Sequence, residues 1–284
     1  MTAVSLLGTG LLGTAIAQRL LDRGLDVHVW NRNASRLGPL VDQGATPILD
    51  LHDAALNRDA VITVLRDGNV TAEVLRSLGP LAQATVIPMG TMGVKESQNL
   101  AAQVIRQGGD YLEAPVLGSR PQALSGTLLV MAGGTATAFT RQQDLLAQLS
   151  QQPIHVGDVG SGAATKLALN QMIASLTHSF SLALRLIQQN GVPVETFMKI
   201  LRPSALYAPT FDKKLQRMLD QHYSDPNFST ALLRKDLRLF LEESATAGLQ
   251  ASGLQGLASL LDEAQGGDLD DQDYCALHEL TALR

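Results

Sequence analysis

Three glycines near the start of the chain have the spacing of a phosphate-binding loop. They lie in the segment Gly8-Thr-Gly10-Leu11-Leu12-Gly13, directly after an apolar β-type run and at the start of a helical pattern. In such a loop the first glycine permits a tight turn, the second lets a pyrophosphate approach the backbone, and the third lets helix and strand pack closely. The following helix adds free N–H groups and the positive end of its dipole. The segment, including Leu11 and Leu12, is therefore predicted to bind a dinucleotide.

The end of the next predicted strand, residues 26–30, indicates which dinucleotide is bound. Proteins that prefer NAD usually carry Asp or Glu here, where the carboxylate accepts a hydrogen bond from the ribose 2′-hydroxyl. This strand ends at Trp30 and is followed by Asn31 and Arg32, with Arg36 one turn further on. Because a guanidinium pairs well with a phosphate, we expect NADP(H) to be held by Asn31 and Arg32. A solvated surface charge is the alternative for Arg32.

A lysine and an asparagine four residues apart form the second group that suggests chemistry. Lys166 and Asn170 follow Gly160 and Gly162 at the start of a long helical pattern. Side chains at positions i and i+4 lie on the same face of a helix. A lysine beside a carbonyl oxygen can polarise it and then donate the proton that an alkoxide needs after hydride transfer. An isolated helical lysine is usually a surface charge. The flanking Gly160, Gly162 and Asn170 favour a functional role for Lys166 instead.

Short β-type runs and helical patterns alternate along the first half of the chain. We expect strands at residues 4–8, 26–30, 61–65, 85–88 and 111–115, and helices at residues 11–22, 70–78 and 95–107. This alternation predicts an α/β Rossmann domain, in which a doubly wound and mostly parallel sheet has helices on both faces. Leu65, at the end of the third strand, is counted with the cofactor-binding residues.

The character of the sequence changes after Gly162. Before it, strands at 127–131 and 154–156 flank a helix at 136–149; beyond it every pattern is helical, beginning with a helix over residues 163–189. That helix is followed by Asn190-Gly191-Val-Pro193, a typical C-terminal stop. We therefore predict an NADP-binding Rossmann domain over residues 1–160 and an all-helical substrate and dimerisation domain over residues 161–284, joined by the long helix.

The composition excludes several other classes of protein. Apolar residues make up 45% and charged residues 17% of the 284, an ordinary globular mixture, and the net charge of -5 argues against a nucleic-acid partner. The single cysteine, Cys275, permits no disulfide within the chain and favours a reducing, cytoplasmic setting. The six histidines are scattered without metal-ligand spacing, so no metal site is expected. No apolar run is long enough for a membrane span, and the apolar start lacks the basic residues of a signal peptide.

The chain resembles the β-hydroxyacid dehydrogenase family in five blocks that occur in the family's order. Besides the glycine loop, these are Met89-Gly-Thr91, Glu113-Ala-Pro-Val-Leu117-Gly118, Gly160-Ser-Gly162-Ala-Ala-Thr-Lys166-Leu-Ala-Leu-Asn170, and Phe228 with Lys235-Asp236. The resemblance covers nearly the whole chain and is to proteins like 3-hydroxyisobutyrate dehydrogenase. The Thr91 and Glu113 blocks look closer to the glyoxylate/succinic semialdehyde reductase branch.

This resemblance implies hydride transfer between a nicotinamide and a small aldehyde or keto acid, or the matching hydroxy acid. The site residues that it implies are Lys166 and Asn170 for catalysis, Thr91 and Lys235 for the cofactor, and Leu117, Gly118, Ser119, Phe228 and Asp236 for the substrate. Other interpretations are core packing for Phe228 and a solvated helix face for the Lys235-Asp236 pair. The resemblance also implies subunits that join through their helical domains.

One position departs from the family's pattern. The family usually has serine before the glycine of the substrate loop, where this chain has Leu117 before Gly118 and Ser119. The backbone N–H groups of Gly118 and Ser119 are still able to bind an anion. An isobutyl group beside a carboxylate nevertheless disfavours it by desolvation. We therefore expect a substrate that is less polar than the family's short hydroxy acids, or one that is placed differently.

Two other functions compete with this one. Imine reduction occurs on related scaffolds, which usually lack the lysine, so Lys166 argues against it while Leu117 leaves it open. A non-catalytic NADP-binding protein would fit a chain without Lys166.

The helical half carries apolar stripes that a thin domain cannot bury alone, and these stripes predict at least a homodimer. The stripes include Leu167, Leu176, Leu184 and Ile187.

Overall fold

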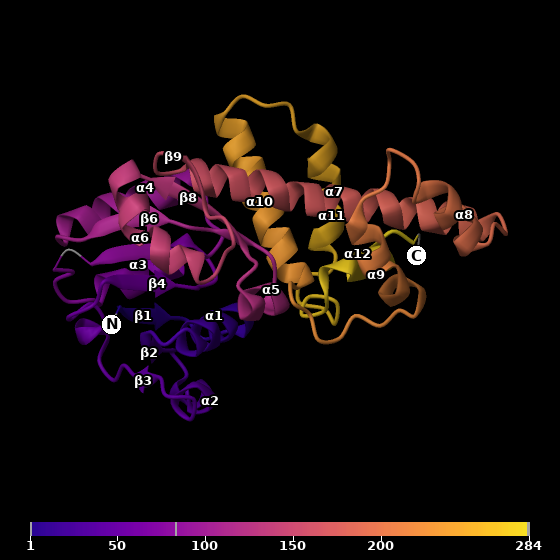
Figure 1. Ribbon diagram of the computed structural model, residues 1–284. Helices are drawn as coiled ribbons and strands as arrows, with labels where there is room; N and C mark the ends of the chain where they lie inside the picture. Colours follow the sequence, from indigo (N-terminus) through magenta and orange to yellow (C-terminus); the bar gives the residue numbers. More distant parts are fainter. Residues whose placement is uncertain (1, 83, 283–284) are drawn as a thin grey trace. The chain divides into compact units, whose positions relative to one another are not determined.

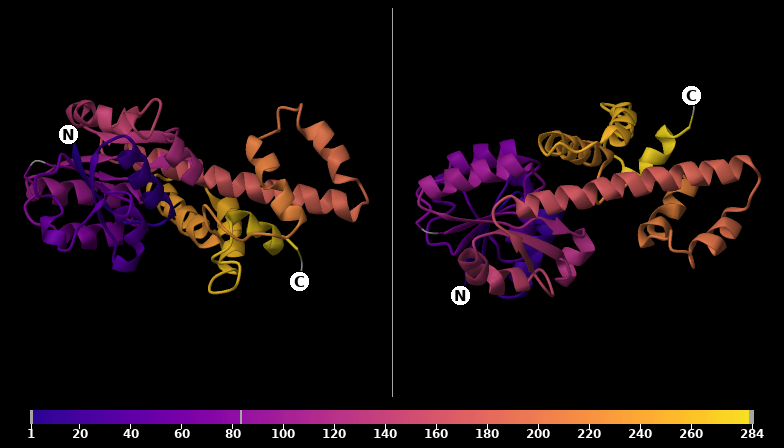
Figure 2. Two further views of the ribbon diagram at one scale, coloured as in Figure 1. Left: turned by 60° about the horizontal axis from the view of Figure 1, so that its bottom comes forward. Right: turned by 90° about the horizontal axis from the view of Figure 1, so that it is seen from above.

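The computed structural model describes residues 2–82 and 84–282, and the chain divides into two compact units, Met1–Leu167 and Ala168–Arg284. The division falls inside one helix, α7 (Ser161–Gln189), which Figure 2 shows unbroken along its length. The boundary predicted from the sequence, between residues 160 and 161, lies at the start of this helix. The first two turns of α7 therefore belong to the first unit by their contacts.

The first unit is built on a mostly parallel sheet (Figure 1), which has nine strands among the described residues, in the order β3-β2-β1-β4-β5-β6-β8-β7 with β9 beside β8. Strands β1 to β6 pair in parallel, whereas β8 is antiparallel to β6 and β7. The strands are β1 (Ala3–Leu7), β2 (Asp26–Trp30), β3 (Thr46–Pro47), β4 (Ala60–Thr63), β5 (Thr85–Pro88), β6 (Asp110–Glu113), β7 (Val116–Leu117), β8 (Leu129–Gly134) and β9 (Ile154–Gly157). This arrangement confirms the predicted doubly wound Rossmann sheet.

Helices cover both faces of this sheet, and the strand sequences explain why (Figure 1). Successive residues of a strand point to opposite faces, and here both sets are buried: Leu6 packs in one apolar core and Leu7 in another. Val61 and Ile62 divide between the two cores in the same way. The helices are α1 (Leu11–Asp22), α2 (Gly38–Val41), α3 (Gly68–Arg76), α4 (Val94–Arg106), α5 (Arg120–Ser125) and α6 (Ala136–Ala147), with short 3₁₀ helices η1 (Ala34–Arg36) and η2 (Leu51–Asp53).

Two strands and two helices of this unit have no counterpart in the predicted elements. Strands β3 and β7 have two residues each, and helices α2 and α5 have four and six. Elements this short carry too few residues to show a period, so no pattern marks them in the sequence. Strand β8 also runs to Gly134, beyond the predicted end at Met131, because Gly133 and Gly134 pair with β6.

The second unit is helical, and no strand occurs among its described residues. Its core lies along one side of α7, where Phe180 stacks on Phe211 with ring centroids 4.5 Å apart. After α7 come α8 (Val194–Leu201), α9 (Pro209–Leu219), α10 (Thr230–Thr246), α11 (Ser252–Asp262), the 3₁₀ helix η3 (Tyr274–Ala276) and α12 (Leu277–Leu280). This confirms the predicted all-helical C-terminal half. None of the described helices is both long and apolar enough to cross a bilayer.

Candidate active site

The glycine loop connects β1 to α1 and fits an external phosphate group. Gly8 has a φ of +107°, which L-residues rarely adopt, and a Cβ there would also collide with the carbonyl oxygen of Val64. A Cβ on Gly13 would overlap the carbonyl oxygen of Gly8, so only glycine lets α1 pack this closely. A Cβ on Gly10 would meet no protein atom within 4 Å. Contacts within the protein therefore require glycine at positions 8 and 13. The space beside Gly10 is open, which suits the close approach of a ligand.

The loop lies where the order of the sheet reverses. Strand β1 is flanked by β2 and β4, and ligands of open α/β sheets bind at the carboxyl ends of the strands at such a point. The predicted residues Leu65 and Thr91 follow β4 and β5, whose carboxyl ends lie at the same edge. A Cβ on Gly8 would lie 2.9 Å from Leu65 Cδ2, and one on Gly90 would collide with the Leu65 carbonyl. The structure thus brings Leu65 and the Thr91 segment to the glycine loop.

The end of β2 is held in place by amide side chains. Asn31 Nδ2 donates to Thr9 Oγ1 at 2.9 Å, and Asn31 Oδ1 accepts from the backbone N–H of Asn33 at 2.9 Å. These bonds fix the position where NAD-preferring proteins carry a carboxylate. Arg32, the next residue, is exposed and forms no ion pair with another residue in the described parts of the chain. Its guanidinium is therefore available to an anion.

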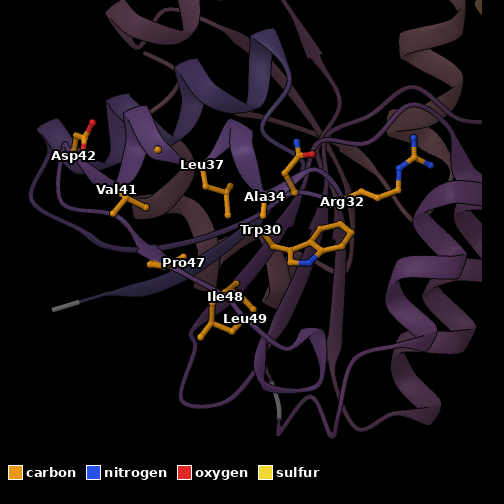
Figure 3. Close-up of a pocket in the computed structure, with 11 residues that line it drawn as sticks. Trp30, Arg32, Ala34, Leu37, Val41, Asp42, Pro47, Ile48 and Leu49 are labelled. Atoms are coloured by element: carbon orange, nitrogen blue, oxygen red, sulfur yellow. The ribbon is translucent and has the colours of Figure 1, made fainter.

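A hollow opens beside this strand end (Figure 3). In that view Trp30, Leu37 and Ile48 lie together at its centre, and the guanidinium of Arg32 extends away from them. The acidic residue of the lining, Asp42, lies on the opposite side of the picture. The hollow is lined by Trp30, Asn31, Arg32, Ala34, Leu37, Gly38, Val41, Asp42, Pro47, Ile48 and Leu49. Its apolar floor and cationic rim suit the adenosine end of a nucleotide.

The loop suggested for the substrate folds into β7 and the N-terminus of α5. Leu117 is half-buried and pairs with Leu129 across the β7–β8 ladder. Gly118 has a φ of +132°, and a Cβ there would lie 2.8 Å from Leu128. The backbone N–H and the hydroxyl of Ser119 both donate to Gln122 Oε1, each at 2.9 Å. The N–H of Ser119, considered above as an anion donor, is thus already bonded inside the protein.

Lys166 and Asn170 lie one turn apart near the start of α7. Lys166 is half-buried in the part of the helix that belongs to the first unit, and Asn170 is 2% exposed in the second unit. Asn170 Nδ2 donates to Asp236 Oδ2 at 2.5 Å, while its Oδ1 is buried without a hydrogen-bond partner. A buried acceptor that the protein leaves unused is uncommon, and this one is able to accept a hydrogen bond from a ligand.

The second unit also assembles the C-terminal residues suggested by the sequence. Asp236 is 1% exposed on α10, and Lys235 Nζ lies 2.7 Å from its Oδ1. Lys235 is half-buried, and together with the buried Asn170 and Asp236 it forms a polar cluster in this unit. Phe228 lies before α10 and packs against Tyr274, with ring centroids 5.9 Å apart. It contributes to the helical core.

Glu113 is the residue with the richest set of contacts that the predicted site left out. Glu113 Oε1 accepts hydrogen bonds from the backbone N–H groups of Gly160, Gly162 and Ala163. Glu113 Oε2 accepts a hydrogen bond from the hydroxyl of Ser97. Burial raises the pKa of the Glu113 carboxyl, because desolvation outweighs these hydrogen bonds. The signal available in the sequence was a glutamate between two apolar residues in a predicted strand, since a buried charge must find partners.

Two matches along the chain decide its family. Residues 3–157 match the family described as the NAD binding domain of 6-phosphogluconate dehydrogenase, and residues 160–281 match that described as NAD-binding of NADP-dependent 3-hydroxyisobutyrate dehydrogenase. The chain belongs to the β-hydroxyacid dehydrogenase family. It is therefore an NAD(P)-dependent oxidoreductase, as the resemblance predicted.

Individual relatives agree with this family over most of the chain. Glyoxylate/succinic semialdehyde reductase 1 of Arabidopsis thaliana is 28% identical over 281 residues, which are 97% of each protein. The structure of 3-hydroxyisobutyrate dehydrogenase from Mycobacterium tuberculosis, with L-serine, has a TM-score of 0.89 at 24% identity and covers 99% of this chain and 100% of its own. An imine reductase from Pseudomonas sp. has a TM-score of 0.66 at 24% identity, covering 99% of each chain. At such identities the two structures show the shared fold alone.

Proposed function

We propose that this dehydrogenase uses NADP(H) to reduce a small aldehyde or keto acid, and oxidises the matching hydroxy acid in reverse. The observation that carries the proposal is Lys166, in the second turn of a helix that follows a dinucleotide-binding sheet in the same unit. The relative from Arabidopsis thaliana supports an aldehyde as the oxidised substrate, since its name states glyoxylate and succinic semialdehyde.

The cofactor site follows from the residues at the edge of the sheet. The backbone between Gly8 and Gly13 and the N-terminus of α1 receive the pyrophosphate, because they offer N–H groups and open space at Gly10. Arg32 pairs with the 2′-phosphate, and Asn31 takes the position of the missing carboxylate. Leu65 is assigned to the cofactor by its place beside the glycine loop, and Thr91 and Lys235 are assigned to it by the family resemblance. When bound, the cofactor supplies or accepts the hydride.

The protein's own groups supply the proton. The Lys166 ammonium donates a hydrogen bond to the substrate carbonyl oxygen, which makes the carbonyl carbon a better hydride acceptor. As the oxygen becomes an alkoxide, Lys166 transfers its proton to it. Asn170 is held by Asp236 through Nδ2, which leaves Oδ1 to accept a hydrogen bond from the substrate. In the reverse direction Lys166 accepts the proton of the hydroxyl group.

The substrate class is limited by the loop at β7. Leu117 presents a half-buried isobutyl group, and both polar groups of Ser119 are engaged with Gln122. We therefore propose that Leu117, Gly118 and Ser119 contact a part of the substrate that bears no charge. The family resemblance assigns Phe228 and Asp236 to the substrate. We keep this assignment for both, with Phe228 acting from the helical core that supports the site.

We propose that residues 1–160 form the NADP-binding domain and also carry the loop that contacts the substrate, whereas residues 161–284 form the helical domain that provides Lys166 and Asn170, one cofactor contact and the surface for a second subunit. Two residues of the predicted stripes, Leu167 and Leu184, are buried within the chain, so they leave nothing for a partner to cover. The second unit nevertheless supports a second subunit, because α7 exposes Met172, Leu182 and Leu186, by 49%, 46% and 63%. Residues spaced in this way lie along one side of a helix. A second copy of the chain would cover them. The buried free thiol of Cys275 fits a cytoplasmic location.

A substrate panel tests the proposal. Oxidation of NADPH and of NADH is followed with glyoxylate, succinic semialdehyde and a cyclic imine. We expect NADPH to be oxidised with at least one of the carbonyl compounds and not with the imine. Turnover of the imine alone would favour imine reduction, which Leu117 permits. Tight NADPH binding without turnover of a broad aldehyde and keto acid panel would instead indicate a non-catalytic protein.

A further inference from the structure

The long helix α7 begins without a capping side chain of its own. The first N–H groups of a helix have no partner within it, and a Ser, Thr, Asp or Asn at the N-cap position usually accepts from the second or third of them. Gly160, which precedes the helix, has no side chain to do so. The N–H groups of Gly162 and Ala163 are buried and need an acceptor from another part of the chain.

Glu113 provides that acceptor from strand β6. Its Oε1 accepts from the N–H groups of Gly160 at 2.9 Å, Gly162 at 2.6 Å and Ala163 at 3.1 Å. The N–H groups of Gly162 and Ala163 are those that an N-cap side chain would bind, and the helix dipole favours a negative charge there. Glu113 therefore acts as a helix cap from a residue that is 47 to 50 positions away in sequence.

The other carboxylate oxygen joins this cap to a second helix. The Ser97 hydroxyl, on α4, donates to Glu113 Oε2, so the Tyr111 hydroxyl donates to Ser97 Oγ at 2.7 Å. Burial raises the pKa of Tyr111, which keeps this hydroxyl protonated and able to donate. Tyr111 and Glu113 are two residues apart on one strand and so point to the same face. The carboxylate is thus fixed from both sides.

The backbone around the carboxylate is shaped to admit it. A Cβ on Gly133, the partner of Glu113 in the β6–β8 ladder, would collide with Glu113 Oε1. A Cβ on Gly162 would lie 2.9 Å from the same oxygen. Glu113 itself is 1% exposed. Two glycines on separate elements therefore leave room for one buried carboxylate. A side chain that only filled space in the core would not need such room around its oxygen atoms.

We propose that Glu113 is a positioning residue for the catalytic lysine: its carboxylate fixes the first turn of α7 and thereby the place of Lys166. Gly162 and Lys166 are four residues apart, so they lie on the same face of adjacent turns. A loosened first turn would let Lys166 move away from the carbonyl oxygen that it protonates. This inference rests on the proposed role of Lys166, but the cap itself does not.

Variants at Glu113 separate capping from packing. Glu113→Met fills a similar volume without an effective acceptor, Glu113→Asp keeps the charge but shortens its reach, and Glu113→Gln keeps an acceptor oxygen. Thr135→Val is the matched control, because Thr135 caps α6 through a 3.1 Å bond from the Ala138 N–H, and α6 carries no proposed site residue. Each variant is compared in amide hydrogen exchange, kcat at saturating substrate and NADPH affinity.

We expect Glu113→Met to raise exchange at Gly162 and Ala163 and to lower kcat, each by about tenfold or more, the order of a lost helix cap. Glu113→Asp should change both in the same direction, which keeps the test decisive if the Met variant does not fold. Glu113→Gln should restore kcat to within about threefold and the exchange to normal, and NADPH affinity should stay within about twofold in all three. Thr135→Val should leave kcat unchanged.

Normal exchange and normal kcat in the Asp and Met variants would overturn the inference. So would faster exchange without any loss of kcat, since the cap would then not position the lysine. Lys166→Ala is measured alongside. If that variant keeps its kcat, the proposed function of Lys166 fails, while the exchange data still report on the cap. If it loses kcat and the Glu113 variants do not, only the positioning role fails.

Discussion

Replacement of Arg32 by aspartate should reverse the choice of cofactor. Arg32 is exposed and makes no ion pair that the described parts of the chain show, so its replacement breaks no contact that holds the fold. The strand end stays anchored through Asn31 and Thr9. Arg32→Asp removes the partner of the 2′-phosphate and introduces an acceptor for the 2′-hydroxyl of NADH. Only the preference between the two cofactors should change.

The size of this effect follows from the kind of bond that is lost. A hydrogen bond to a charged group contributes about 1.5–3 kcal/mol, which corresponds to a loss of roughly 10- to 150-fold in kcat/KM with NADPH. The new carboxylate repels the phosphate and adds to this loss. With NADH, kcat/KM should stay equal or rise.

Steady-state kinetics with both cofactors at fixed substrate measures the ratio directly. Arg106→Asp makes the same change of charge at the end of α4, away from β2, and should leave the ratio unaltered. An Arg32→Asp enzyme that keeps its NADPH preference would refute the assignment of Arg32. Equal effects of the two substitutions would show that the cofactor preference responds to the overall charge of the protein and not to Arg32 in particular.

Two further predictions concern the substrate loop and assembly. Leu117→Ser should raise kcat/KM for carboxylate-bearing substrates such as glyoxylate relative to an uncharged aldehyde, because it replaces an apolar neighbour with a hydroxyl; an unchanged ratio in the substrate panel would place Leu117 away from the substrate. Light scattering at micromolar concentration should give the mass of at least a dimer, and Leu186→Glu should lower that mass, because Leu186 is the most exposed of the three apolar residues on α7. A monomeric wild-type protein would contradict the proposed assembly.

The parts of the fold that were predictable are those defined by local patterns. Helix α1 has the predicted bounds, Leu11–Asp22, because glycines and apolar spacing mark both its start and its face. Strand β2 likewise has its predicted bounds, Asp26–Trp30. Both depend on residues that are close in sequence. The two-residue strands β3 and β7 depend instead on neighbouring strands, which no local period records.

The polar contacts of the candidate site show the same limit. Lys166 and Asn170 were found together because one helix turn separates them. The bond between Asn170 and Asp236 joins residues 66 positions apart, and the cap from Glu113 to Gly162 spans 49. Such pairs form only after the sheet and helices have packed. The sequence showed a glutamate between two apolar residues and a helix that begins after a glycine, but not that the glutamate caps the helix.

The central claim is that Lys166 donates the proton in the reduction, and Lys166→Ala tests it most directly. With the best substrate of the panel, the account predicts that kcat falls by roughly 10²–10⁴-fold, the usual contribution of a general acid. NADPH affinity should barely change, since the residues assigned to pyrophosphate and ribose lie elsewhere, and Lys166→Arg should not restore kcat, because a guanidinium stays protonated and is bulkier. A Lys166→Ala enzyme with near-normal kcat and a raised KM would show a residue that only binds substrate, and would contradict the account.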